Sequence, residues 1–600
     1  MKRIFLLCVL GMSLATEAAP KGVSPVISSG KDRRLVYDFD ARSNRVPDFS
    51  TCGYAGGDRE IPNAPVRVVV APVPGDETEL IQRALNQVAG LPADTNGIRG
   101  AVLLLKGRHE ILGGLVITNS GVVLRGQGME ADGTMLVGTG LDRRTLIRVS
   151  GKKDFSTRTN SGWEISEDYV PVGATSFHLA DAGGLKVGDT IRVIRPCTAA
   201  WIEKLGANEF GGGEGGGWKP GSRDIAWNRT VKAIEGNLIT VDASITTALE
   251  KSEIPNSKAE IQSATPHVVA YSPVGRISHI GIENFSLEST CDAGNLKNEN
   301  HSWFGITMEN AADAWVRQVR FKHFAGSAVA LYETVQRVTV EDCLSLAPVS
   351  EIGGYRRHTF FTMGQQTLFL RCYAEHGRHD FSVGHCAAGP NAFVQCEAHE
   401  ALEDSGSIES WASGVLYDNV TIDGNALTLG YRAGNNAGIG WAAANSMVWN
   451  CSASVIRCWN PPGAQNWSLG SWGSFEGDGV WRSSNNFMSP DSLFAAQLHD
   501  RLGSEAAARL QLMPRPHEES SNPSVEKAQE LAAASHEPAP LLRDYIAAAP
   551  KRNPIPDEPG NAKRIEDIAE IHHSSLITRL SSPTAGSPSA ANSSSAARRT

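Results

Sequence analysis

Short stretches that mix apolar and polar residues recur along the chain from about residue 267 onward. Each stretch is rich in Val, Ile, Leu and Phe, and no long amphipathic helical pattern separates one stretch from the next. This spacing excludes an alternation of strands and helices as the main organisation and predicts a coiled β-solenoid. The clearest stretches are residues 279–288, 314–323, 337–345, 367–375, 392–400, 415–424 and 446–454.

A cysteine or an asparagine occupies nearly the same place in five of these stretches. The successive gaps between them are 29, 24, 23 and 32 residues, and periods of about 20 to 50 residues are typical of solenoids. We expect the cysteines to stack inside the coils as small apolar side chains. Disulfides between Cys386 and Cys396, or between Cys451 and Cys458, remain the alternative. The compared residues are Cys343, Cys372, Cys396, Asn419 and Cys451.

Two patterns precede the repeats and suggest how the solenoid begins. Apolar residues recur at helical spacing between Asp76 and Leu91, which predicts a helix able to seal the open end of a first coil. Short apolar strands broken by glycines then follow over residues 100–128. The residues that carry this pattern are Asp76, Thr78, Ile81, Gln82, Ala84, Gly100, Val102, Leu104, Gly107, Ile111, Val123, Leu124, Gly126 and Gly128.

In this order the residues resemble the beginning of pectate-lyase-like proteins, and the chain from Ile81 to about Gly473 resembles bacterial secreted members of that superfamily. The resemblance implies an all-β, right-handed parallel β-helix and leaves the substrate open. The chain lacks a recognisable copy of the calcium and arginine motif of pectate lyases. It also lacks the Asn-x-Asp, Asp-Asp and Gly-His-Gly series of polygalacturonases, so no catalytic residue is carried over from either group.

The N-terminus predicts export. Lys2 and Arg3 precede an apolar run that ends near small residues at Ala18 and Ala19, which is typical of a cleaved secretory signal and too short to span a membrane. The expected location is therefore secreted or periplasmic. The predicted segments are a signal peptide (1–19), an extended wrap (20–75), a capping helix with the first coils (76–163), a β insertion with a glycine- and tryptophan-rich loop (164–250), the main β-helix (251–485), a C-terminal helix (486–512) and a mostly disordered tail (513–600).

The bulk composition narrows the possible partners. The 600 residues carry a formal net charge of −9 and are 41% hydrophobic, with 60 glycines. A large core and many turns agree with a solenoid, and the acidic balance argues against a nucleic-acid partner, which would require a basic face. No later segment is apolar enough to predict a membrane span.

The candidate chemistry lies between Gly353 and Trp411. Two similar pieces, RRHTF and GRHDF, place His358 and His379 at a spacing of 21 residues. Aligning the aromatic residues of three successive coils places these histidines in one column with Glu409, beside a column containing Arg357 and Arg378. The aligned aromatic residues are Phe360, Phe381 and Trp411. A shift of one residue in this alignment would reverse which side chains face solvent.

A cluster of arginine and histidine on an acidic secreted protein suits an anionic sugar, because guanidinium binds carboxylate through paired hydrogen bonds. The main hypothesis is a polysaccharide lyase that cleaves a uronate-containing glycan by β-elimination. Arg357 or Arg378 would neutralise the uronate, His358 or His379 would be the base, and Tyr355 would be the acid or its partner. The expected substrate-binding residues are Arg356, Asp380, Glu409, Trp411, Trp218, Trp441, Asn466 and Trp467.

Other roles stay open for the same stretch. A glycoside hydrolase would use two carboxyl groups, and a non-catalytic carbohydrate-binding or surface protein would use none. The cluster could also be structural, with its arginines paired to acids of neighbouring coils. The spacing of the histidines fits no closed zinc site, whereas acidic turns could hold Ca²⁺. The carboxylates considered for hydrolysis are Asp380, Glu400, Glu403, Asp404 and Glu409.

Overall fold

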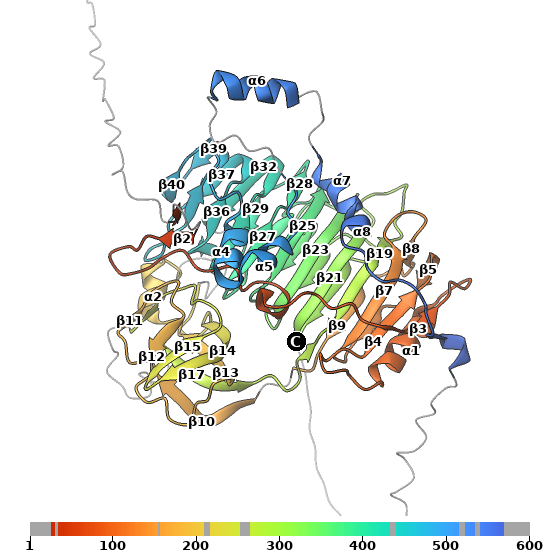
Figure 1. Cartoon of the computed structure of the whole chain (residues 1–600), viewed down its shortest axis with the longest axis horizontal. Coiled ribbons are helices and arrows are strands. Elements are labelled where there is room, and N and C mark those ends of the chain that lie inside the picture. The colour runs from red at the N-terminus through yellow and green to blue at the C-terminus, as the bar shows by residue number, and fades with distance from the viewer. Residues whose placement is uncertain are drawn as a thin grey trace, which may run out of the picture.

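The computed structural model describes residues 26–29, 34–153, 156–208, 217–251, 265–432, 440–514, 523–534 and 540–568. Its body is a parallel β-helix in which 27 strands form one continuous hydrogen-bonded sheet (Figure 1). The predicted parallel β-helix is therefore confirmed. The predicted signal peptide and the end of the predicted tail lie outside the described residues.

Each coil passes through three faces, and the longer strands bend from one face into the next. Face A contains β3 (Val66–Val70), β4 (Gly100–Leu104), β7 (Val122–Gly128), β18 (Ile277–Ser278), the first parts of β19 (Gly281–Ser289), β21 (Ala311–Lys322), β23 (Gln336–Leu346) and β25 (Leu368–Glu375), and then β27 (Asn391–Val394), β31 (Val415–Asp418), β36 (Met447–Trp449), β38 (Trp467–Leu469) and β40 (Val480–Arg482).

Face B contains β5 (Gly107–Ile111), β8 (Thr134–Gly138), the second parts of β19, β21, β23 and β25, β28 (Glu397–His399), and the beginnings of β32 (Thr421–Leu429), β37 (Ser452–Cys458) and β39 (Trp472–Glu476). Face C contains β6 (Leu115–Ile117), β9 (Thr145–Ser150), β20 (Phe304–Glu309), β22 (Ser327–Leu331), β24 (Phe360–Thr362), β26 (Phe381–Val383), β29 (Ser405–Ser407), and the ends of β32, β37 and β39. Apolar side chains from the three faces meet in one long core.

The cysteine stack confirms the period and corrects one of its members. Cys343 pairs in register with Cys372, and both are fully buried. Because Thr421 pairs with Glu397 and with Ser452, the residue stacked between Cys396 and Cys451 is Val420, so the prediction for Asn419 is wrong by one position. All nine cysteines in the described part of the chain are free, so neither alternative disulfide forms.

The corner between faces A and B is closed by one residue with positive φ in each coil. Side chains other than glycine rarely adopt this conformation, although Asn and Asp tolerate it better than most. In this conformation a single residue turns the chain sharply from one strand to the next. The corner residues are Asn284, Gln318, Asp342, Arg371, Gln395, Asn419 and Asn450, with φ between 49° and 67°.

The side chains of these corner residues, apart from Asn284, which bonds to Gly126, bind the C-terminal part of the chain, which we call the C-terminal strap (residues 486–514 and 540–568). The amide of Asn450 donates to the carbonyl oxygen of Met488 at 2.7 Å and accepts from its N–H at 2.8 Å. Gln395 makes the same pair of bonds with Met513, at 2.8 and 2.7 Å. Gln318 donates to the carbonyl oxygen of Asn553 at 2.7 Å.

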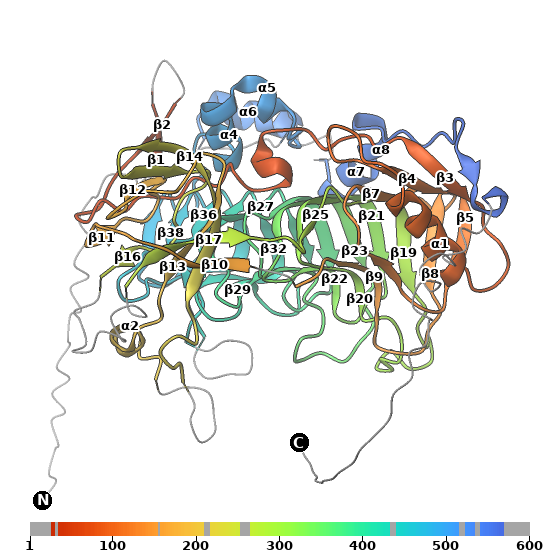
Figure 2. The same ribbon diagram turned by 90° about the horizontal axis from the view of Figure 1, so that it is seen from below.

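The strap continues to the first coil, where β41 (Lys563–Arg564) pairs with β3. It therefore runs back along the solenoid from the last coil to the first (Figures 1 and 2). The prediction of a mostly disordered tail is wrong for residues 540–568, in which Leu542, Ile546 and Ile565 are buried. The helices described beyond residue 486 are α4 (Leu493–Leu502), α5 (Ser504–Ala508), α6 (Val525–Ala534), α7 (Leu542–Ala547), α8 (Ala549–Arg552) and the 3₁₀ turn η2 (Ile565–Asp567).

The other end of the chain covers the same side of the solenoid. Helix α1 (Thr78–Ala89) forms where the apolar spacing predicts a helix, and Ile81, Ala84, Leu85 and Val88 of this helix seal the core. Before it, residues 45–63 run in an extended path over face A and include the 3₁₀ turn η1 (Tyr54–Gly57). A hairpin of β1 (Val26–Ser29) and β2 (Arg34–Tyr37) precedes this path.

The predicted β insertion is an antiparallel six-stranded sheet beside the later coils (Figure 2). It extends from residue 156 to residue 272, beyond the predicted limits of 164 and 250. Its strands are β10 (Ser156–Glu164), β17 (His267–Ser272), β13 (Thr190–Arg195), β14 (Ile225–Glu235), β15 (Leu238–Val241) and β12 (Ser176–His178), in spatial order. The smaller elements of the insertion are the strand pair β11 (Tyr169–Val170) and β16 (Leu249–Glu250) and the helix α2 (Ala199–Lys204). Two further strand pairs lie later in the chain. They are β30 (Ala412–Ser413) with β35 (Ala443–Ala444), and β33 (Tyr431–Arg432) with β34 (Gly440–Trp441).

The corner ion pairs give a test of how much the strap stabilises the fold. Asp342 accepts hydrogen bonds from Arg371 at 2.7 and 2.8 Å and from Arg552 of the strap at 2.7 Å. In Asp342→Ala, the buried guanidinium of Arg371 loses its closest carboxylate partner, so we expect the free energy of unfolding to fall by about 3 to 5 kcal/mol. Equilibrium denaturation of the full chain measures this change.

The matched control is Glu476→Ala, which removes an acid from the exposed pair with Arg457, where the two side chains lie 2.7 Å apart. An exposed pair contributes at most about 1 kcal/mol, so this variant should be nearly as stable as the wild type. Equal losses in the two variants would contradict the proposed contribution of the corner.

Candidate functional site

Three successive strands of face C fix the alignment that the sequence left uncertain. Phe360 pairs with Phe381, and their rings stack inside the core with centroids 5.8 Å apart. In the next coil Val383 pairs with Ser407, which places Ser405 beneath Phe381. The column of His358 and His379 therefore continues to Glu403. The expected alignment through Trp411 is wrong by six residues, and Glu409 belongs to a different column, with His385.

The two histidines of this column lie against each other below the surface. Their ring centroids are 4.8 Å apart with the rings nearly perpendicular, and only 3% of His358 and 1% of His379 is exposed. His379 Nδ1 lies 2.6 Å from the carbonyl oxygen of Asp404, and Nε2 lies 3.5 Å from the carboxylate of Glu403. Burial holds the pKa of His358 well below its usual range, and its electrostatic interactions with His379 and Arg378 act in the same direction. His358 is therefore a neutral imidazole at neutral pH.

Tyr355 leads from this buried pair to the surface. Its ring centroid lies 5.6 Å from that of His358, whereas 52% of the residue is exposed. Its hydroxyl donates a hydrogen bond of 2.7 Å to Glu409 Oε1. Partial burial and this bond to a carboxylate raise the pKa of Tyr355 to about 12, so the phenol keeps its proton at neutral pH.

His385 completes the accessible part of the cluster. Its Nε2 lies 3.9 Å from the same Glu409 oxygen that accepts the Tyr355 hydrogen bond, and its side chain is exposed. A phenol, a carboxylate and an imidazole thus converge on one point of face C. These are groups that donate and accept protons in general acid–base chemistry.

The three predicted arginines are engaged by neighbouring groups. Arg357 donates to Ser350 Oγ at 2.9 Å and to the backbone oxygens of Ser350 and His376 at 2.9 and 3.2 Å, so it holds the loop before β24. Arg378 donates to Glu403 at 2.7 Å and to the carbonyl oxygen of Gly354, the residue before Tyr355. Of these two arginines, Arg378 is the one whose contacts bring a guanidinium to the Tyr355 loop.

Arg356 contributes to a separate cluster on the same side of the solenoid. Its guanidinium pairs with Glu299 at 3.1 Å and lies 5.3 Å from the ring centroid of Trp303. Arg143 approaches the same ring to 5.1 Å and the same carboxylate to 3.3 Å. This arrangement positions the loop that carries Tyr355.

Asp380 is a structural residue, which corrects its expected contact with substrate. It is fully buried and accepts a hydrogen bond of 2.6 Å from Thr359 Oγ1. Burial raises the pKa of Asp380 to about 6. Gly377 packs directly against this carboxylate, and a Cβ at that position would lie only 1.6 Å from Oδ1. A ligand on the surface does not reach this carboxyl group in this arrangement.

Two of the predicted sugar-stacking tryptophans instead hold the β insertion to the solenoid. Trp411 is 1% exposed, packs edge-on against Trp201 with centroids 5.0 Å apart, and donates to Thr247 Oγ1 at 3.2 Å. Trp218 is also buried and lies 5.4 Å from Trp201. Their roles are therefore corrected from substrate binding to packing.

The remaining predicted substrate-binding residues are Asn466, Trp467 and Trp441, and only Trp441 is partly exposed. Asn466 is buried and donates to the carbonyl oxygens of Ala443 and Trp459, at 3.1 and 2.7 Å. Trp467 belongs to a core cluster. Both are structural residues, which corrects their expected role. Trp441 is only half-buried and contacts Tyr431 edge-on with centroids 5.3 Å apart, so it stays available to a ligand.

Sequence reasoning did not assign a role to His385 and gave Glu403 only a general one. The third coil of the site has Ser-Gly-Ser at β29 where the other two coils have aromatic residues. Because β29 has no aromatic residue, the alignment of the three coils used the next one along the chain, Trp411. The spacing of 24 residues between His385 and Glu409, one coil length, is the signal that could have paired them.

The described part of the chain gives no support for a metal centre at this face. No group of three or more His, Cys, Asp or Glu side chains placed to hold a metal ion is found among the described residues. No helix in the described ranges is long and apolar enough to cross a membrane.

Comparisons with known proteins gave matches to one family model and to solved structures. Residues 479–583, which include the whole strap, match a domain of unknown function (DUF6298). No significant match was found among curated proteins. Among solved structures, the chain is similar to the tailspike protein gp49 from Pseudomonas phage LKA1, with 14% identity, a TM-score of 0.37, and coverage of 68% of this chain and 72% of that chain.

Two further similar structures have equally low identity. A variant tailspike of E. coli bacteriophage HK620 in complex with a pentasaccharide has 10% identity and a TM-score of 0.34, with coverage of 70% of this chain and 66% of that chain. The A-module of the mannuronan C-5 epimerase AlgE6 from Azotobacter vinelandii has 10% identity and a TM-score of 0.26, with coverage of 68% and 85%.

The raised pKa of Asp380 predicts a pH-dependent stability. Between the ordinary value of 3.8 and the folded value of about 6, the folded state binds a proton that the unfolded state has released. Stability should therefore fall as the pH rises through this interval, by about 3 kcal/mol from this group. Asp380→Asn lacks the titration, so the variant should gain stability relative to the wild type between pH 4 and pH 7.

Chemical denaturation at both pH values measures this difference. The exposed carboxylate Asp423, which lies 3.1 Å from His399, supplies the control Asp423→Asn, for which the difference should hardly change. A stability difference between Asp380→Asn and the wild type that is the same at both pH values would show that Asp380 titrates normally.

Proposed function

We propose that this protein is a carbohydrate-active enzyme that works at face C, and that it cleaves a uronate-containing polysaccharide by β-elimination. The observation that carries the proposal is the convergence of the Tyr355 hydroxyl and the His385 imidazole on Glu409. A protonated phenol beside an imidazole provides the acid and the base that an elimination requires.

The arrangement assigns a role to each accessible group. His385 removes the proton from C5 of the uronate, the C4–O bond breaks as the C4–C5 double bond forms, and Tyr355 gives its proton to the leaving oxygen. Arg378, held at the Tyr355 loop by the carbonyl of Gly354, is the guanidinium placed to pair with the uronate carboxylate. Glu409 orients the phenol through its hydrogen bond.

The predicted bases His358 and His379 take a different part in this proposal. Both are nearly inaccessible, and a general base must come within hydrogen-bond distance of the proton that it removes. We infer that they support Tyr355 from below as a buried pair of packed rings. The proposed base is therefore still a histidine, but it is His385 and not His358 or His379.

Hydrolysis is the second candidate, and the feature that favours it is the Glu409 carboxylate, which is 8% exposed and lies beside the exposed His385. Glycosidases generally require two carboxyl groups about 5 to 9.5 Å apart. The other acid of the cluster, Glu403, is already engaged by Arg378 and His379 and belongs to the column at the opposite end of β29. This arrangement favours elimination over hydrolysis.

The decisive experiment incubates the full chain with a panel of uronate polymers and neutral glycans. Elimination gives an unsaturated product that absorbs ultraviolet light together with new reducing ends. New reducing ends without this absorbance would overturn elimination in favour of hydrolysis. Binding with neither signal would show a non-catalytic carbohydrate-binding protein.

Removal of the Tyr355 hydroxyl tests the acid. Tyr355→Phe keeps the ring against His358 and loses the proton donor, so we expect kcat to fall by about 10² to 10⁴-fold with little change in thermal stability. The control is Tyr169→Phe in the insertion, which loses a hydroxyl that donates to Asn44 at 2.8 Å. Full activity of Tyr355→Phe would remove Tyr355 from the mechanism.

The charge of Glu409 should control the titration of Tyr355. Because this carboxylate raises the pKa of the phenol, Glu409→Gln should lower that pKa and allow tyrosinate to form at a lower pH. Ultraviolet difference titration of Glu409→Gln and of wild type, each against the matching protein that also carries Tyr355→Phe, isolates this tyrosine. An unchanged titration would mean that Tyr355 and Glu409 are not paired in solution.

A further inference from the structure

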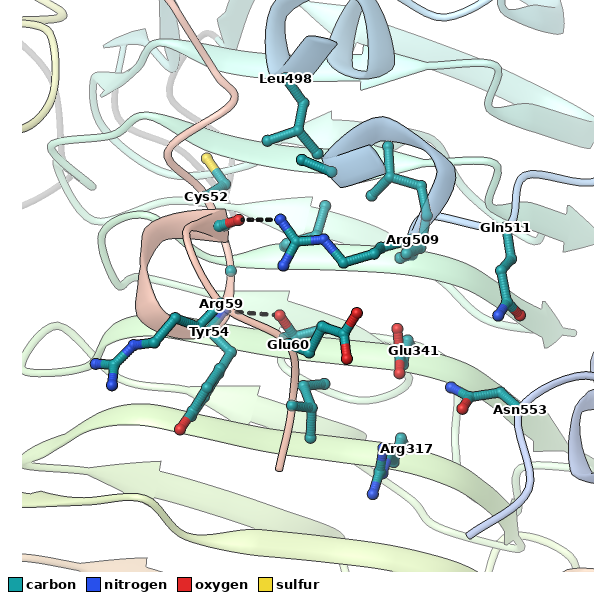
Figure 3. Close-up of a pocket in the computed structure, with 18 of the residues that line it drawn as sticks. Cys52, Tyr54, Arg59, Glu60, Arg317, Glu341, Leu498, Arg509, Gln511 and Asn553 are labelled. Atoms are coloured by element: carbon teal, nitrogen blue, oxygen red, sulfur yellow. Dashed lines mark hydrogen bonds between the residues drawn. The ribbon is translucent and has the colours of Figure 1, made fainter. Parts of the chain in front are cut away.

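A cavity of about 250 Å³ lies on face A, away from the face C cluster (Figure 3). Its floor is the outer surface of β21, β23 and β25. The extended N-terminal segment covers one side, and α4, α5 and the following strap residues cover the other. Three parts of the chain that are remote in sequence therefore meet around one space.

Glu341 on β23 is the central polar group of this cavity. The residue is only 9% exposed, and its carboxylate accepts no hydrogen bond from any residue that the structure describes. The guanidinium of Arg371 lies 3.6 Å from it, and Arg317 lines the same cavity. Arg371 donates hydrogen bonds to Asp342 instead, so the capacity of Glu341 to accept hydrogen bonds is unused. Burial raises the pKa of Glu341, and the attraction of Arg371 only partly opposes this shift.

A polar atom of a second side chain beside Glu341 also lacks a hydrogen-bond partner among the described residues. Oε1 of Gln511 is buried and has no hydrogen-bond partner in the described part of the chain. Figure 3 shows the carboxylate of Glu60 pointing toward Glu341 from the N-terminal segment, with Gln511 and Asn553 of the strap on the other side. Carboxylates only accept hydrogen bonds, whereas the two amides both donate and accept.

The opposite wall of the cavity is apolar. Leu368 and Leu370 from β25 face it, together with Phe494 and Leu498 from α4. A pocket with an apolar wall and a few convergent polar groups is the usual form of a small-molecule site. Its volume is below the roughly 300 Å³ at which sites for drug-sized ligands begin, so it suits a single small ring.

We propose that this cavity binds one ring of a neutral sugar. Hydroxyl groups would supply the hydrogen-bond donors that Glu341 and Glu60 lack, and ring oxygens would accept from the amides of Gln511 and Asn553. The apolar face of the ring would lie against Leu368 and Leu370. The charged residues that line the cavity are Arg59, Arg317 and Arg509 together with Glu60 and Glu341. A cation would meet the arginines and an anion would meet the carboxylates, so a neutral polyhydroxylated ligand fits best.

This site is independent of the reaction proposed at face C. Because the ligand would contact the N-terminal segment, the solenoid and the strap together, its binding would also stabilise the fold by mass action. We therefore expect the bound sugar to raise the melting temperature of the full chain, in addition to the binding signal that is observed directly.

The experiment titrates the full chain with free glucose, galactose, mannose and xylose, observed by saturation-transfer NMR and by thermal melting. At least one sugar should bind the wild type. Glu341→Gln should weaken that binding by roughly tenfold or more, since it replaces a carboxylate by an amide that accepts less well. Gln511→Ala changes a half-buried position and should weaken sugar binding several-fold. This variant tests the proposal if Glu341→Gln does not fold.

The control variants separate this cavity from face C. Glu476→Gln changes an exposed carboxylate elsewhere, so it should leave the affinity for free sugar unchanged. Glu409→Gln reports separately on any sugar that binds at the face C cluster. Absence of binding by all four sugars would overturn the proposal. Unchanged binding in folded Glu341→Gln and in Gln511→Ala would also overturn it, as would loss of binding only in Glu409→Gln.

Discussion

The corner between faces A and B is the constraint on which the rest of the solenoid depends. A single residue with positive φ turns each coil there, a conformation that costs roughly 1 to 2 kcal/mol for a residue with a side chain. The corner side chains recover this energy by bonding to the strap, as Asn450 does with Met488 and Gln395 does with Met513. The coils and the strap therefore stabilise each other.

This coupling explains how the two ends of the chain create a cavity that the coils alone would not have. Face A of an isolated solenoid would be an open surface. The N-terminal segment and the strap cover it and enclose the space around Glu341. The face C cluster is built differently, because the strand register places His385 and Glu409 in one column, and the loop before β24 brings Tyr355 to them.

Several features were predictable because they depend on local pattern. The stack of Cys343, Cys372, Cys396 and Cys451 followed from the period of the repeats, and helix α1 followed from its apolar spacing. The His358 and His379 pair was predictable because Phe360 and Phe381 mark the same strand position in both coils. The third coil lacks such a ring, so the prediction aligned Glu409 with the two histidines, whereas the structure places Glu403 there.

The sequence by itself determined the solenoid, its period, the sealing helix and the stretch that contains the candidate site. These depend on the alternation of apolar and polar residues, which each short segment carries within itself. Only the tertiary structure decided which side chains are accessible. It buried His358, Asp380 and Trp411 and exposed His385. It also folded residues 540–568 onto the first coils, because their partners lie hundreds of residues away in the chain.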